Sequence, residues 1–170
     1  QVLYGLAVLL AAVIRLSGLD NIPLSPAEAA EALSVYEYWQ PGATAVVSGS
    51  PAYFSLTSLL TQVLGFSDGV MRLVPALFGI ALPVLPWFLR HRLGSVGALV
   101  ASFLLVISPV HSLLARTAGG QSIALFSGLL LFIAWLRYQE SDNGRWFIAA
   151  VIALAFGLSS SPIFYSSLLS

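Results

Sequence analysis

Apolar residues gather into five long runs, which are separated by short polar segments and by one long segment. A helix that crosses the hydrocarbon core of a bilayer needs about 20 apolar residues, with a lower limit near 17. Because all five runs reach or approach this length, the chain is predicted to be an all-α, polytopic transmembrane helical bundle. The predicted spans are Val2–Leu16, Val70–Leu89, Leu93–Val110, Ser122–Leu136 and Trp146–Leu158.

The segment 19–69 between the first two runs is too long for a simple connection, and its pattern predicts two further helices. Ser25 followed by Pro26 and Glu28 is typical of a capped helix start, and this helix is expected to end near Trp39. In the stretch Tyr53–Leu64, apolar and uncharged polar residues fall on opposite faces. An amphipathic helix of this kind is predicted to lie in the membrane interface.

The chain has no internal repeat and no low-complexity tract, and residues 1–170 are predicted to form one transmembrane domain with an outer loop at 19–69 that contains two interfacial helices. The first apolar run starts at once after Gln1, and the last residues lie within another apolar run. We therefore expect the chain to be a piece of a longer polytopic protein.

The composition also indicates a membrane protein, whose apolar surface contacts lipid. Hydrophobic residues make up 58% of the chain and charged residues 8%, whereas soluble domains carry about 25% charged residues. The net charge is zero and there is no lysine, which argues against a nucleic-acid partner. The absence of cysteine excludes disulfides and thiolate metal sites.

The arginines predict an orientation in the membrane. Arg90, Arg92, Arg137 and Arg145 lie in two loops that are separated by two predicted spans, so both loops should lie on the same side. By the positive-inside rule, loops 90–92 and 137–145 are cytoplasmic, and segments 19–69 and 108–121 face outward.

The outward-facing segments contain the candidates for chemistry, and each has two interpretations. Glu28 either closes the capping box of its helix or acts as a catalytic acid at the membrane surface. Arg15, Arg72 and Arg116 either extend toward lipid headgroups or bind a lipid phosphate through the forked guanidinium. His111 is either an interfacial polar residue, which the lack of a partner histidine or carboxylate at helical spacing favours, or a base or ligand.

Several short motifs occur in an order that resembles one family, the glycosyltransferase superfamily C enzymes that use polyprenyl-phosphate sugars, of the protein mannosyltransferase and aminoarabinose transferase type. These motifs are Arg15-Leu16, the alanine-rich segment 27–32, Pro51-Ala52-Tyr53, the segment 72–79, Ser108-Pro109 and Arg116. The resemblance implies that Arg15, Arg72, Arg116, Tyr53 and Gln121 bind the substrate or its lipid phosphate.

This chain departs from the family's pattern at three polar positions. Ala27 stands where the family carries the aspartate that is its expected base, next to Glu28. Gln121 stands where the second outer loop has an aspartate. Ser159-Ser160-Ser161-Pro162 replaces a lysine that is often followed by glutamate. Alanine cannot accept a proton, so Glu28 is the remaining candidate for a catalytic acid.

Two functions follow from the resemblance. The protein is either a sugar transferase with impaired or lost catalysis or a structural or assembly subunit of a larger membrane complex. The implied partners are a polyprenyl-phosphate lipid and, in the second case, other membrane subunits, in the plasma (inner) membrane. No cofactor is predicted, and the question of a divalent metal stays open.

Overall fold

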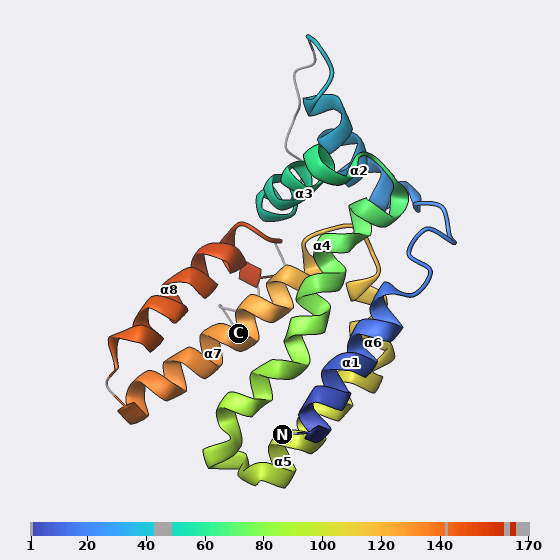
Figure 1. Ribbon diagram of the computed structural model, residues 1–170. Helices are drawn as coiled ribbons and strands as arrows, with labels where there is room; N and C mark the ends of the chain where they lie inside the picture. The colour runs from blue at the N-terminus through green and yellow to red at the C-terminus, as the bar shows by residue number, and fades with distance from the viewer. Residues whose placement is uncertain (1, 43–48, 142, 162–163, 166–170) are drawn as a thin grey trace.

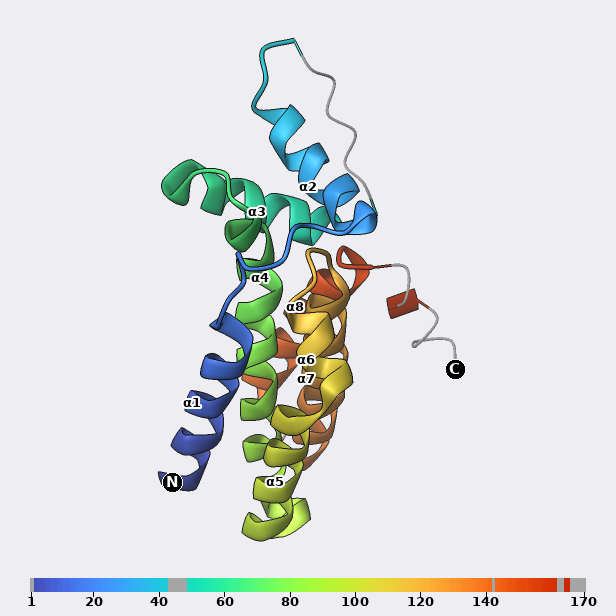
Figure 2. The ribbon, with the colours of Figure 1, turned by 90° about the vertical axis from the view of Figure 1, so that its right-hand side faces the viewer.

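The computed structural model describes residues 2–42, 49–141, 143–161 and 164–165 of the protein, and every regular element within these ranges is helical. The predicted all-α class is confirmed for this part of the chain. Six helices form an elongated bundle, α3 (Pro51–Leu64) lies across one end of it, and α2 (Pro26–Tyr38) rises away from that end (Figures 1 and 2). The bundle contains α1 (Val2–Leu16), α4 (Asp68–Ala81), α5 (Arg90–Ile107), α6 (Pro109–Ala115), α7 (Gln121–Ser141) and α8 (Gly144–Leu158).

Prolines and one glycine shape the turn at the opposite end of the bundle. Helix α4 continues into a 3-10 helix, η1 (Leu82–Leu89), which contains Pro83 and Pro86. Proline has no N–H for the α-helical bond, so this stretch has the tighter 3-10 geometry. Gly94 has a φ of 73°, a left-handed conformation that glycine adopts at little cost, and there α5 departs from helical geometry. The chain then returns alongside η1 (Figure 2).

By length and hydropathy, two helical stretches of the described residues could cross a membrane. They are Asp68–Ile107, which includes the turn at Gly94, and Gln121–Ser141. Val2–Leu16 and Gly144–Leu158 are apolar but shorter. The helical interpretation of all five apolar runs is thus confirmed, whereas the count of five spans stays a prediction.

The two predicted helices of the segment 19–69 are present. Ser25 caps α2 with a complete capping box, and α3 runs from Pro51 to Leu64. On the side of α3 that faces the protein, Tyr53, Thr57, Ser58 and Thr61 are buried. The opposite side exposes Val63, which is 82% exposed, together with the polar residues Ser55 and Gln62. The location of α3 in the membrane interface stays a prediction.

The two loops rich in arginine lie at the same end of the bundle. Arg92 forms an ion pair with Glu140 near the end of α7, and Arg137 lies 3.5 Å from the same carboxylate. Helices α2 and α3 are at the opposite end (Figures 1 and 2). We call this the outer end, following the predicted orientation.

Candidate functional site

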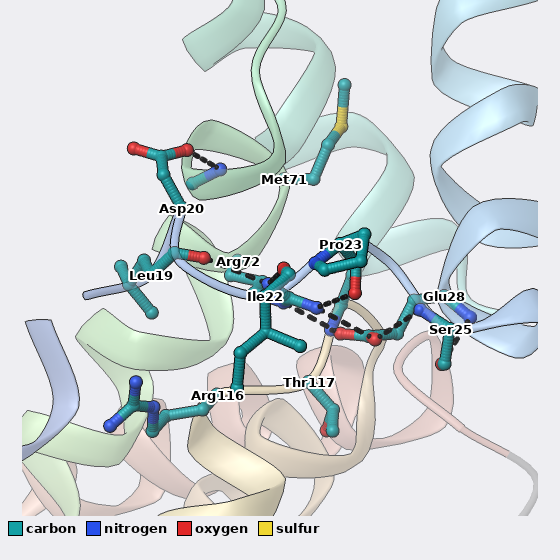
Figure 3. A network of polar contacts seen from close by, with 12 residues as sticks. Leu19, Asp20, Ile22, Pro23, Ser25, Glu28, Met71, Arg72, Arg116 and Thr117 are labelled. Carbon is teal, nitrogen blue, oxygen red and sulfur yellow. Dashed lines mark hydrogen bonds and ion pairs between the residues drawn. The ribbon is translucent and has the colours of Figure 1, made fainter.

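A buried ion pair between Glu28 and Arg72 lies at the centre of the outer end (Figure 3). The carboxylate comes from the first turn of α2 and the guanidinium from the second turn of α4. Arg72 Nε donates to Glu28 Oε1 at 2.9 Å, and Nη2 donates to Oε2 at 3.0 Å. The side chains are only 7% and 8% exposed, so water does not compete for this two-point contact.

Arg72 also binds the connection between α1 and α2. Its Nη1 donates to the carbonyl oxygens of Leu19 and Ile22, and its Nη2 donates to that of Pro23. Together with the two bonds to Glu28, these contacts use all five N–H groups of the guanidinium. In this conformation, Arg72 has no donor left for a lipid phosphate, and it organises the connection instead.

Glu28 joins three segments of the chain. Besides Arg72, its carboxylate accepts hydrogen bonds from the backbone N–H of Ser25 and of Ala118, each at 2.9 Å. Burial alone would raise the pKa of Glu28, but the bonds from Arg72, Ser25 and Ala118 stabilise the charged form and lower it to about 2. The side chain is therefore a carboxylate at neutral pH and a weak base. It completes the predicted capping box as well as the ion pair.

Arg116 holds the C-terminal end of α1. Its guanidinium donates to the carbonyl oxygens of Ile14, Ser17 and Gly18 at 2.9 to 3.3 Å. These groups include carbonyls that the end of a helix leaves without intrahelical partners. In Figure 3 the Arg116 side chain extends away from the Glu28–Arg72 pair, so the two arginines bind successive parts of one connection.

Arg15 is fully buried, and part of its guanidinium has no acceptor. Its Nη2 donates to the carbonyl oxygen of Leu105 at 3.0 Å, while Nε and Nη1 have no hydrogen-bond partner. A side chain at Gly79 of α4 would lie 3.1 Å from Arg15 Cδ and Nε, so the glycine leaves room for the arginine.

Tyr53 and Gln121 differ in their surroundings. The Tyr53 hydroxyl is buried and donates to the carbonyl oxygen of Met71 at 2.9 Å, and burial raises the pKa of this phenol. Gln121 is the first residue of α7, and its Oε1 is buried without a hydrogen-bond partner. Tyr53 therefore joins α3 to α4, whereas Gln121 retains a free acceptor.

The segments that contain the three positions where the resemblance implies charged groups lie at this end and are linked by contacts of neighbouring residues. The Ala118 N–H binds Glu28, the neighbour of Ala27, and Gln121 follows three residues later. The Ala52 N–H at the start of α3 donates to the Ser159 carbonyl at 2.8 Å. At Gly120, a Cβ would lie 1.8 Å from the Ser160 carbonyl oxygen and 2.1 Å from Ser50 Oγ. The sequence did not single out Ser50, whose buried hydroxyl has no partner.

No group of three or more His, Asp or Glu side chains within the described ranges lies close enough to hold a metal ion. His111 Nδ1 lies 2.8 Å from Ser108 Oγ at the start of α6. The imidazole is also within range of the positive charge of Arg15. The site combines arginines and the paired carboxylate of Glu28 with neutral hydroxyl and amide groups, and the carboxylate of Asp20 accepts a hydrogen bond from the Gly69 N–H beside them (Figure 3).

Comparison with known proteins identifies the family. Residues 48–164, more than two thirds of the chain, match the model of the dolichyl-phosphate-mannose-protein mannosyltransferases. The chain belongs to this family. The resemblance inferred from the short motifs is thereby confirmed, and the family is one of membrane-bound glycosyltransferases.

A curated relative agrees with this family. The chain is 23% identical over 120 residues to YkcB of Bacillus subtilis (strain 168), a protein provisionally named a mannosyltransferase. This alignment covers 69% of the chain but only 16% of the relative. No solved structure matches the chain. Of the candidate site residues, Tyr53, Arg72, Arg116 and Gln121 lie within the matched region of the mannosyltransferase family model, while Arg15 and Glu28 precede it.

Proposed function

We propose that the protein binds a polyprenyl-phosphate lipid at the outer end of a five-span bundle in the plasma membrane and transfers sugar from it slowly or not at all. The observation that carries this proposal is the state of Glu28. It is the acid that remains beside Ala27, and its two oxygens accept four hydrogen bonds from protein donors.

A general base must be free to accept a proton and should have a pKa near the working pH. A carboxylate with a pKa of about 2 that is bound to Arg72 meets neither condition. Ala27 and Gln121 contribute no carboxylate at the two places where the resemblance implies one. Because a positioned base contributes about 10²–10⁴-fold to a rate, its loss supports very weak transfer.

The proposal is tested by transfer from a labelled polyprenyl-phosphate sugar in proteoliposomes. The natural protein is compared with Glu28→Gln and with the double variant Ala27→Asp and Gln121→Asp. We expect no measurable transfer by the natural protein and a gain in the double variant. Robust turnover by the natural protein that is lost in Glu28→Gln, with the fold retained, would make Glu28 the working acid and refute the proposal.

The second candidate, an assembly subunit, is favoured by the exposed aromatic and apolar side chains at the outer end of α2. Tyr36, Tyr38 and Trp39 are each 39% to 54% exposed. Mild solubilisation followed by size measurement distinguishes the two functions. A stoichiometric complex that dissociates in Tyr36→Ser with Tyr38→Ser supports the subunit role, and a monomer that retains lipid supports the first proposal.

A further inference from the structure

An apolar groove with a volume of about 670 Å³ lies between α1 and η1, and we call it the α1–η1 groove. Its lining residues are Tyr4, Gly5, Val8, Leu9 and Ala12 of α1 with Val84 and Trp87 of η1. From Tyr4 to Ala12 the groove extends about 12 Å along the axis of α1, and the hydrocarbon layer of one leaflet is about 15 Å thick. The groove therefore has the length and the polarity that suit one acyl chain.

Polar groups lie at one end of this groove. The start of α1 and the turn from η1 into α5 are at the same end of the bundle (Figure 2), and there Tyr4 and Trp87 pack edge to face with ring centroids 4.5 Å apart. The Tyr4 hydroxyl is buried and has no hydrogen-bond partner among the described residues. Because a buried hydroxyl without a partner costs free energy, this position favours an added hydrogen-bonding group.

A cation lies beside the same end of the groove. Arg90 is not a lining residue, but its Cζ is 4.4 Å from the centroid of the Trp87 ring, which does line the groove. Arg90 is exposed and forms no ion pair with a described residue. The segments 90–92 and 137–145 together carry four arginines and two acidic residues, so this end has an excess of positive charge. It is complementary to an anionic headgroup.

We propose that the α1–η1 groove binds an anionic phospholipid of the cytoplasmic leaflet, with one acyl chain in the groove and the phosphate beside Arg90. The Tyr4 hydroxyl donates to an ester or phosphate oxygen of this lipid. Trp87 lies between chain and headgroup, as aromatic residues do at membrane interfaces. Basic groups at the cytoplasmic surface attract anionic lipids. The site is at the end opposite to Glu28 and Arg72, and it depends on the predicted orientation, not on sugar transfer.

Quenching of tryptophan fluorescence by brominated lipids tests this site, because bromine on an acyl chain quenches an indole that it contacts. Trp39→Phe, Trp135→Phe and Trp146→Phe together leave Trp87 as the single tryptophan. This variant is reconstituted in phosphatidylcholine vesicles that contain a minor fraction of brominated phosphatidylglycerol or the same fraction of brominated phosphatidylcholine. We expect stronger quenching by phosphatidylglycerol. Arg90→Gln should lower this preference by about fivefold, as the contribution of one basic residue near an anionic surface implies.

Matched variants separate the site from its surroundings. Arg145→Gln removes an exposed arginine from the same end without touching the groove lining, so it should keep the preference, and Arg90→Lys should keep it as well. Gly5→Phe fills the groove and should reduce quenching by both lipids, whereas Leu6→Phe at an exposed position outside the lining should not. Native mass spectrometry of the natural protein and of Arg90→Gln, released from the same vesicles, measures retained phosphatidylglycerol without any tryptophan substitution.

Equal quenching by the two brominated lipids in the single-tryptophan variant overturns the inference. An equal loss of preference in Arg145→Gln and Arg90→Gln also overturns it, because diffuse surface charge would then attract the lipid. If polyprenyl phosphate displaces brominated phosphatidylglycerol at lower concentration than unlabelled phosphatidylglycerol does, the occupant is the lipid-linked substrate and the inference is wrong. Trp87 that neither lipid quenches, in a variant that unfolds like the natural protein, shows that protein covers the groove and likewise refutes it. None of these outcomes measures sugar transfer, so the proposed function is tested separately.

Discussion

Glu28, which the sequence offers as a catalytic candidate, is part of the structural framework through its ion pair with Arg72. The guanidinium satisfies both oxygens of Glu28, and the remaining contacts come from the backbone of Ser25 and Ala118. Removing one partner of a buried pair leaves the other charge without compensation, which costs about 3–5 kcal/mol. The pair therefore fixes α2 against α4 and the 116–120 connection.

We predict that Glu28→Gln lowers the free energy of unfolding by several kcal/mol and removes an acid-dependent transition. The folded-state pKa is about 2, below the ordinary value of 4.5, so ionised Glu28 stabilises the fold fully above pH about 5. This contribution is lost as the pH falls from there toward 2. Thermal unfolding in detergent as a function of pH measures both effects.

Glu37→Gln is the matched control, since Glu37 lies on the same helix and forms no ion pair with a described residue. The control should unfold like the natural protein at every pH. If Glu28→Gln also unfolds like the natural protein at every pH, the ion pair contributes nothing to stability. Glu28 would then again be a candidate for a free acid.

At the scale of the elements, the start of α7 lies close against its neighbours at the outer end. Gly120 precedes α7 and lies against the carbonyl of Ser160 and the hydroxyl of Ser50. Of the three atoms nearest to a Cβ at this position, two belong to the backbone of Ser160, which cannot rotate away, and the third is the hydroxyl oxygen of Ser50. Only a residue without a Cβ allows α7, the end of α8 and the start of α3 to approach so closely.

Gly120→Ala is therefore expected to destabilise the protein by about 1–3 kcal/mol, the usual cost of overpacking a well-packed site. Gly5→Ala in α1 is the control, because no atom lies within 4 Å of the added Cβ. Thermal unfolding of both variants in the same detergent provides the comparison. Equal stability of Gly120→Ala and Gly5→Ala would show that the three segments separate freely.

At the scale of the whole molecule, polarity differs between the two ends of the bundle. The end that contains Arg92, Arg137 and Glu140 has solvent-accessible ion pairs, whereas at the outer end the Glu28–Arg72 pair is buried and Asp20 is exposed. This arrangement agrees with the positive-inside rule, which assigns the first end to the cytoplasm.

Single cysteines introduced into this cysteine-free chain test the orientation. Gln40→Cys and Arg145→Cys both lie at exposed positions, at opposite ends. In sealed right-side-out vesicles, an impermeant maleimide should label Gln40→Cys at once and Arg145→Cys only after permeabilisation. Labelling of both before permeabilisation, in vesicles shown to be intact, would refute the proposed topology.

Local signals in the sequence determined the helices of this protein. The apolar runs, the capping box of Ser25 and Glu28, and Pro51 at the start of α3 act within a few residues, so the all-α class and both outer helices could be predicted. The order of short motifs likewise sufficed to indicate the family. The number of spans could not be fixed in this way, because a helix of 15 residues, such as α1 or α8, is compatible with more than one position relative to a bilayer.

Tertiary structure alone decided what each arginine does. Arg72 meets Glu28 across 44 residues and the Leu19 carbonyl across 53, and Arg116 reaches Ile14 across 102. No sequence pattern encodes such contacts, because backbone carbonyls are present at every position and only packing brings particular ones within reach. For the same reason, the sequence offered three equivalent arginines, and the fold left unused donors on Arg15.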